Sequence, residues 1–200
     1  MNVLNFGIEQ IITWLLVFCR TTGIFSVAPV FGNIHVPIHT RVGFAACLAF
    51  IFTPLVSAGY AAPPTDIIGL TFAIGRETAV GLAIGFVGML LFMVIQSAAE
   101  LIDLQMGLGF ASLVDPNNQH ASVVGQFYHI VATLIFLCVN AHHLLLQGLA
   151  DSFSVVPLGQ MTFNPGATGN IVLMFNQMFV AAIKIGGPII GVILLTDVAL

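Results

Sequence analysis

Three polar side chains near the middle of the chain have a spacing that suits charge transfer. Gln96, Glu100 and Asp103 follow one another at intervals of four and three residues. On a helix this spacing places them in one polar stripe on an otherwise apolar surface. The stripe either relays protons or cations, or forms buried ion pairs with arginine side chains that fix helix packing. We favour pairing, although the spacing does not identify the partners.

Other residue types that bind metals or perform catalysis lack the spacing that either chemistry needs. His35 and His39 are four residues apart, but Pro37 interrupts the helix that would place both rings on one face. The glutamate that acts as general base in zinc protease motifs is missing between them. His142 and His143 are adjacent, so on a helix their rings should point in different directions. We therefore predict no bound metal, no cofactor, no catalytic residue and no enzymatic activity.

Composition restricts the class of protein further. The 200 residues are 58% hydrophobic and only 6% charged, whereas soluble domains are about 25% charged. Mean hydropathy is +1.08. A soluble surface cannot be built from four basic and eight acidic side chains, and so few basic residues argue against nucleic-acid binding. The chain is expected in a membrane, or buried among similar chains.

Long uncharged runs predict helices as the elements that position these residues. The run between Arg41 and Asp66 has 24 residues and the run between Glu77 and Glu100 has 22, each enough to span a bilayer with about 20 residues. Thr65 and Asp66 provide a helix-capping signal. No run alternates apolar and polar residues as a strand would. The fold is predicted to be all-α, with helices at 8–28, 41–56, 66–114 with a break near Arg76, 121–149 and 169–200.

Six charged side chains flank or interrupt these apolar helices. A charge at membrane depth is costly and usually faces a partner group or a water-filled cavity. We therefore expect these side chains to lie in protein interfaces and to be paired, in preference to facing lipid. They are Arg20, Arg41, Arg76, Glu77, Glu100 and Asp103.

Two glycines four residues apart predict a close contact between helices. Gly81 and Gly85 lie in the segment GLAIG, and small residues at this spacing let helix backbones approach closely in membranes. We favour tight helix packing over a ligand-binding role for this pair.

A glycine-rich apolar segment follows the polar stripe. Glycine weakens a helix by about 1 kcal/mol relative to alanine, and a proline disfavours helical geometry in the residue before it. Irregular backbone at membrane depth requires cover by protein or a cavity. An ordinary interhelical turn and a gate or plug in a pore are equally compatible with this pattern. The residues are Met106, Gly107, Leu108, Gly109, Phe110, Ala111, Ser112, Leu113, Val114, Asp115 and Pro116.

Five segments carry a pattern that extends over essentially the whole chain. They are TGIFSVAPVFGNIHVPIHTRVGFA (22–45), GRETAVGLAIGF (75–86), ELIDLQMGLGFASLVDP (100–116), NAHHLLLQGLADSF (140–153) and GGPIIGVILLTDVAL (186–200). In this order they resemble the FliR family of flagellar biosynthesis proteins, which includes the export-gate subunit of virulence type III secretion systems. The combination is far more specific than any single segment.

The resemblance implies a fold of helical hairpins packed against partner subunits in an export-gate assembly. The expected partners are FliP-like and FliQ-like gate subunits, an FlhB-like switch subunit and membrane lipid. Family members look like fusions, so one export-gate domain at 1–200 should combine a FliP-like part at about 1–160 with a FliQ-like part at about 161–200. Members usually continue with a further apolar helix, so the C-terminal part is expected to be incomplete.

The resemblance also implies a function. The chain would be a structural pore subunit of a flagellar-type (type III) protein export gate, through which unfolded flagellar or effector proteins cross the bacterial inner membrane. It would belong to a flagellar basal body or a type III secretion machine, and the family's pore-closing loop maps onto Met106 to about Ser122. The alternative is a small secondary transporter or ion channel with Glu100 and Asp103 as the coupling site. Transporters often contain inverted repeats, and the hydropathy shows no clear one.

Overall fold

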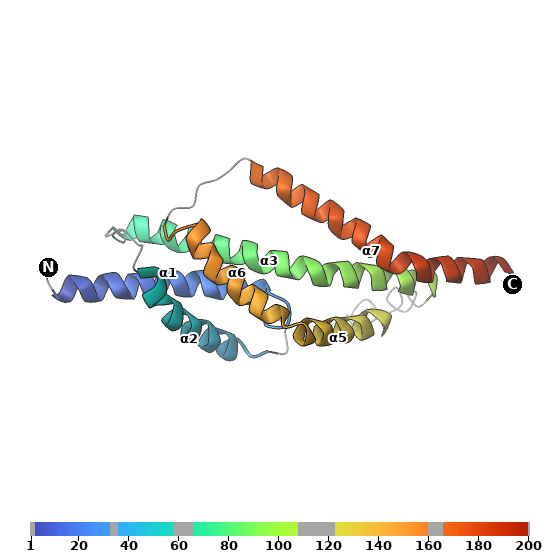
Figure 1. Ribbon diagram of the computed structural model, residues 1–200, viewed down its shortest axis with the longest axis horizontal. Coiled ribbons are helices and arrows are strands. Elements are labelled where there is room, and N and C mark those ends of the chain that lie inside the picture. The colour runs from blue at the N-terminus through green and yellow to red at the C-terminus, as the bar shows by residue number, and fades with distance from the viewer. Residues whose placement is uncertain (1–2, 33–35, 58–65, 108–122, 160–165, 200) are drawn as a thin grey trace. The chain divides into compact units, whose positions relative to one another are not determined.

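The computed structural model describes residues 3–32, 36–57, 66–107, 123–159 and 166–199. Within these ranges all regular structure is helical, which confirms the all-α prediction. Figure 1 shows the helices in chain order. They are α1 (Val3–Val27), α2 (Ile38–Ser57), α3 (Ile67–Gln105), α5 (Val123–Cys138), α6 (Ala141–Val155) and α7 (Gly166–Ala199).

The start of α3 follows the capping signal in the sequence. Asp66 precedes the helix, and its carboxylate accepts a hydrogen bond from the Gly69 N–H at 3.0 Å. This bond satisfies one of the backbone donors that a helix leaves unpaired at its first turn. The predicted cap at Asp66 is confirmed.

The predicted break near Arg76 is wrong, because α3 continues through this position for 39 residues. The charges there need no break in the helix. Arg76 is exposed, and the buried Glu77 finds its partner on another helix. The helix ends at Gln105, earlier than the predicted 114, and Gly107 follows with a φ of 74°. A left-handed glycine is a common helix terminator.

The predicted helix at 121–149 is also wrong, because the structure has two helices there. Asn140 lies between α5 and α6 with a φ of 55°. Asparagine enters this left-handed region more readily than most residues, since its short polar side chain bonds locally. The N–H of Asn140 donates to the Leu137 carbonyl at 3.1 Å, which closes α5.

The chain forms two compact units, and α3 contributes to both. The first unit contains Met1–Met89 and His142–Phe163, and the second contains Leu90–Ala141 and Asn164–Leu200. Each has its own buried residues and is described separately.

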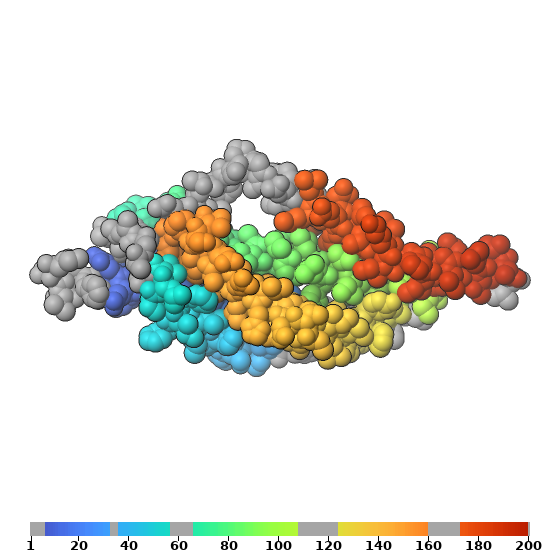
Figure 2. All heavy atoms as spheres, viewed as in Figure 1, coloured from blue at the N-terminus to red at the C-terminus, as the bar shows by residue number. Residues whose placement is uncertain are grey.

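The first unit packs α1, α2, the first part of α3 and α6 around two apolar clusters. One cluster is Leu16, Val17, Ala49, Ala73 and Leu158. The other is Ile24, Ala28 and Leu149. Phe52 of α2 and Phe153 of α6 border both clusters. Their rings lie 6.2 Å apart, and α6 lies beside α2 in the space-filling view (Figure 2).

The second unit contains the rest of α3 with α5 and α7. Ala98 of α3 and Ala182 of α7 are almost fully buried. A Cβ placed on Gly186 of α7 would lie 3.5 Å from the Ala98 carbonyl oxygen, so small residues line this contact. Between α3 and α5, the rings of Phe92 and Phe136 meet edge to face at 5.6 Å.

Among the described residues, four helices are long and apolar enough to cross a membrane. These candidate spans are Gly7–Val27, Ile38–Val56, Ile67–Gln105 and Leu173–Ala199. Together, α5 and α6 could form a fifth span. Most residues in these spans are not buried within the chain; the buried share is 22% for the α3 window and 17% for the α7 window. Large apolar faces are therefore left for lipid or for other proteins.

Candidate functional site

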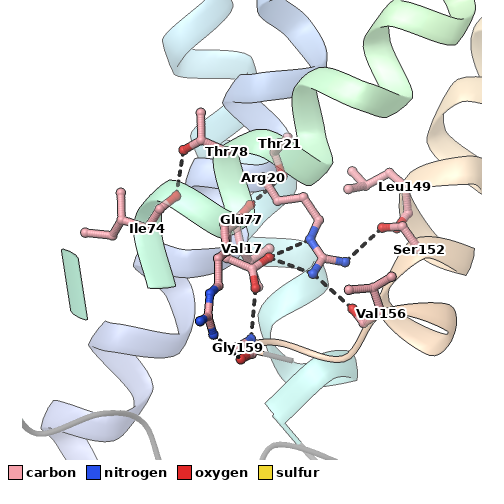
Figure 3. Close-up of polar contacts among 11 residues, drawn as sticks. Val17, Arg20, Thr21, Ile74, Glu77, Thr78, Leu149, Ser152, Val156 and Gly159 are labelled. Atoms are coloured by element: carbon pink, nitrogen blue, oxygen red, sulfur yellow. Dashed lines mark hydrogen bonds and ion pairs between the residues drawn. The ribbon is translucent and has the colours of Figure 1, made fainter. Parts of the chain in front are cut away.

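A buried ion pair connects α1 to α3 in the first unit. The Nε of Arg20 donates to Glu77 Oε2 at 2.6 Å, and Nη2 lies 2.6 Å from the same oxygen. The two side chains are 0% and 2% exposed. Figure 3 shows both pointing into the space between the helices and the end of α6.

The remaining polar atoms of this pair are occupied by α6 and the turn after it. Nη1 of Arg20 donates to Ser152 Oγ at 3.1 Å, and Nη2 donates to the Val156 carbonyl at 3.0 Å. The guanidinium carbon lies 4.4 Å from the centre of the Phe153 ring, a cation–π arrangement. Glu77 Oε1 accepts from the Gly159 N–H at 2.9 Å. We refer to Arg20, Glu77, Ser152, Phe153, Val156 and Gly159 as the Arg20 cluster.

The cluster holds the turn that follows α6 in a conformation that favours glycine. Gly159 has a φ of 73°, a region that side chains disfavour. In this conformation its N–H reaches Glu77, while its carbonyl lies 3.4 Å from Nη1 of Arg76. Glu77 and Arg76, which are adjacent on α3, thus bond to the N–H and the carbonyl oxygen of Gly159, respectively. The segment is fixed by charge-assisted bonds, which are stronger than neutral ones.

The hydroxyl groups nearest the cluster are bonded within their own helices. Thr21 donates to the Val17 carbonyl and Thr78 to the Ile74 carbonyl, each at 2.8 Å (Figure 3). They therefore leave the arginine and glutamate contacts undisturbed. The cluster is buried and its charges neutralise one another, so it holds α1, α3 and the end of α6 together.

Close backbone contact between α1 and α3 brings the charged pair together. A Cβ added to Gly81 would overlap the Arg20 carbonyl, and one added to Gly85 would lie 2.7 Å from the Ile24 carbonyl oxygen. On α1, a Cβ at Gly23 would lie 2.7 Å from the Thr78 carbonyl oxygen. Alanine at any of these positions requires the helices to separate. The glycines thus set the distance at which Arg20 reaches Glu77.

The other charged residues singled out in the sequence lie outside this cluster. Arg41 donates from Nε to the Val36 carbonyl at 3.1 Å. Glu100 is exposed and accepts from Gln96 Nε2 at 3.1 Å, whereas Asp103 is 4% exposed. Arg20 therefore pairs with Glu77 and not with a carboxylate of the polar stripe. Pairing of the exposed side chains within an assembly stays a prediction.

The segment interpreted as a turn or plug begins where α3 ends. Met106 is 52% exposed, and Gly107 has the left-handed φ noted above. The N–H of Gly107 donates to the Leu104 carbonyl at 3.2 Å, which completes the last turn of the helix. Residues 108–116 lie outside the described residues.

The structure contradicts one expectation about the adjacent histidines of α6. The rings of His142 and His143 lie 4.4 Å apart, so the expectation that they point in different directions is wrong. They occupy the first turn of α6, where no preceding turn restricts the side chains. His39 is exposed, and His35 lies outside the described residues.

Sequence reasoning missed Gly23 of α1 and the members of the cluster that come from α6 and the turn after it. Gly23 follows Arg20 by three residues, a spacing that places both on one helix face. This spacing was an available signal for the contact with Gly81. Ser152 and Gly159 had no such signal, because their partners lie 132 and 82 residues away in the chain.

Comparison with known proteins identifies the wider group. The sequence model of the family described as "Bacterial export proteins, family 1" matches residues 11–200. The flagellar biosynthetic protein FliR of Bacillus subtilis (strain 168) is 34% identical, over 98% of this chain and 77% of that protein. The FliR proteins of Escherichia coli (strain K12) and Aquifex aeolicus (strain VF5) are each 29% identical over 96% of this chain. These alignments cover 75% and 74% of the relatives.

Breaking the buried pair from one side should strongly destabilise the first unit. Glu77→Ala leaves the Arg20 guanidinium buried without a counter-charge, which costs about 3–5 kcal/mol. The double variant Arg20→Met with Glu77→Leu should lose less stability, because it removes both charges and keeps apolar volume. Thermal unfolding and protease resistance of the purified complex measure the effect. Glu9→Gln, at an exposed glutamate, is the control. Equal melting temperatures of Glu77→Ala and Glu9→Gln would contradict the prediction.

Alanine at Gly81 should also destabilise the protein, because its Cβ would meet the backbone of α1. Overpacking of this kind costs about 1–3 kcal/mol. Gly75→Ala is a matched control on the same helix, since nothing lies within 4 Å of the added carbon. The control should be neutral or stabilising by up to about 1 kcal/mol, the helix propensity difference. Equal losses of melting temperature in both variants would show that the helices do not depend on this close approach.

Proposed function

The chain belongs to the bacterial export proteins, family 1, as do its FliR relatives, and from this premise we propose how it works within the export gate. It is a structural subunit of the flagellar or type III export gate in the bacterial inner membrane, and not an enzyme. We propose that it forms part of the channel wall together with FliP-like and FliQ-like subunits, with an FlhB-like switch subunit at the gate. Unfolded flagellar or effector proteins would pass through this channel.

The observation that carries the proposal is the length of the apolar helices. With 39 residues, α3 is about 58 Å long at a rise of 1.5 Å per residue, and α7, with 34, is about 51 Å. The hydrocarbon core of a bilayer is only about 30 Å thick. Tilt alone does not absorb this excess in α3, because average tilts are about 20°. Part of each helix therefore extends beyond the lipid tails.

Apolar side chains remain exposed along these helices. Phe72 and Leu91 of α3 are 65% and 62% exposed, and Leu195 of α7 is 73% exposed. Outside the hydrocarbon core, a continuous apolar surface requires cover by other proteins. Helices of partner subunits provide that cover, which is the role that a gate assembly would give them.

The gate itself is proposed to be the segment from Met106 to Pro116. Its support is the glycine-rich apolar sequence and its position directly after α3, whose last turn ends at Gly107. Apolar constrictions block ions by excluding water. The FliP-like part at about 1–160 and FliQ-like part at about 161–200 belong to the same proposal.

The transporter alternative gains little support from the polar stripe. Glu100 is exposed and bonded to Gln96, whereas Asp103 is buried. A coupling site needs acidic groups that open to one shared aqueous path. These two carboxylates have different environments, so the export gate remains the function that we propose.

Shortening the segment should open a leak. Deletion of three or four residues within Leu108–Leu113 removes apolar side chains that would close the channel, so cells carrying it should become permeable to small ions. Growth at raised salt and a potential-sensitive dye measure the leak. Co-purification of partner subunits at the wild-type yield is the control for assembly. Deletions that remain ion-tight and still export protein would contradict the plug assignment.

The chain should be unstable when it is produced alone. Its exposed apolar faces exceed what lipid can cover, so solitary expression is expected to give degradation or aggregation in detergent. Co-expression with FliP-like and FliQ-like subunits should restore a monodisperse complex, measured by size-exclusion chromatography. A protease-resistant monomer from solitary expression would remove the main physical support for the proposal.

A further inference from the structure

The backbone directly after α1 contains a strained residue. Val30 has a φ of 70°, a region that β-branched side chains rarely adopt. The N–H of Phe31 donates to the Pro29 carbonyl at 2.8 Å. A hydrogen bond across three residues with a positive φ at the central one defines the strained form of γ-turn, in contrast to the common inverse form. We refer to residues 28–32 as the Val30 turn.

Side-chain contacts hold this turn in place. The ring of Phe31 meets the ring of Phe25 edge to face at 4.9 Å and stacks on that of Phe44 at 6.0 Å. Phe25 of α1 and Phe44 of α2 also meet, at 5.3 Å. Aromatic pairs in these arrangements attract one another beyond the effect of the area they bury. The N–H of Gly32 donates to the Ala28 carbonyl at 2.7 Å. Three rings and a backbone bond therefore oppose the strain in the turn.

The turn also reaches α3 and α6. A Cβ placed on Gly88 of α3 would lie 3.2 Å from Pro29 Cδ and 3.1 Å from Leu145 Cδ2 of α6. Both side chains thus fill the space that a larger residue at this position would occupy. Phe31 packs against the apolar cluster that includes Leu149 of α6. The Val30 turn therefore contacts every helix of the first unit.

The Val30 turn and the Arg20 cluster lie at different levels of the first unit. On α3, Gly88 follows Glu77 by 11 residues, roughly 16 Å along the helix axis. Charge-assisted bonds fix the level of the Arg20 cluster. The other level depends on a strained backbone that its neighbours hold in place. Such strain persists only where the surrounding structure imposes it, and it is found at switch regions.

We infer that the Val30 turn is a two-state element, at which the first unit opens during protein export while the Arg20 cluster keeps α1, α3 and α6 together. In the open state Val30 takes a negative φ, the bond between Phe31 and Pro29 breaks, and Pro29 withdraws from Gly88. The released strain offsets part of the lost ring contacts, so the two states lie close in free energy. The two-state turn rests on the first unit alone, and its use in export rests on the proposed function.

Glycine at position 30 tests for the strain in the purified complex. Val30→Gly removes the conflict between the side chain and φ, and this relief should exceed the entropic cost of glycine. We expect the melting temperature to rise by about 2–4 °C. Val27→Gly is the matched control and should lower it, because Val27 is half-buried like Val30 but ends a regular helix. A loss in Val30→Gly as large as in the control would overturn the inference.

Hydrogen exchange tests for the two states directly. In the wild-type complex, the N–H groups of Phe31 and Gly32 should exchange at least tenfold faster than that of Gly159, which bonds to a buried carboxylate. Val30→Gly should slow exchange at Gly32 at least threefold, whereas Phe31→Ala should accelerate it, because the ring contacts are lost. Combining both changes should return the rate towards wild type, which separates a shifted equilibrium from misfolding. Equal exchange in wild type and Val30→Gly would overturn the inference.

Secretion of a flagellar protein by cells tests the use of the turn. Val30→Gly favours the closed state, so secretion should fall at least threefold while the yield of the complex stays the same. Unchanged secretion together with slower exchange would overturn the inference and leave the proposed function intact. Secretion at the wild-type rate in cells that lack the chain altogether would contradict the proposed function, and the two-state turn would then rest on hydrogen exchange.

Discussion

Burial of an arginine together with a glutamate stabilises a protein only if nearly every polar atom on both is satisfied. In the first unit this condition is met by three separate elements. Arg20 and Glu77 come from α1 and α3, while Ser152 and the carbonyl of Val156 are supplied by the end of α6. The glycines between α1 and α3 are needed because a longer distance would leave the two charges apart. The packing of the unit therefore depends on this one pair.

The buried polar contacts and the exposed apolar faces of the chain have different roles. Inside the first unit, charges are neutralised and the turn at Gly159 is fixed. Outside, the long apolar helices are mostly exposed, and α3 is longer than a bilayer is thick. A subunit of a large assembly needs this combination, because its internal contacts fix the helices while its outer faces are available to pack against other subunits.

The sequence predicted what depends on neighbouring residues and missed what depends on distant ones. The helical class and the cap at Asp66 were predictable, because long uncharged runs and capping residues act locally. Arg20 and Glu77 were recognised as charges in need of partners, but their pairing was not, since 57 residues separate them. A break was wrongly predicted at Arg76 for the same reason, because the partner that lets the adjacent Glu77 stay buried in a continuous helix lies far away in the sequence. The break at Asn140 was missed because a single asparagine within an apolar run gives a weak signal.

The sequence separations within the Arg20 cluster impose an order on biosynthesis. Ribosomes add about 5–20 residues per second, so Glu77 follows Arg20 by about 3–11 s, given the 57 residues between them. Val156 is 136 residues from Arg20 and follows it by about 7–27 s. During this interval α1 emerges with a charge that has no complete set of partners. A membrane insertase or chaperone that shields α1 until α6 has been made would remove this period of exposure.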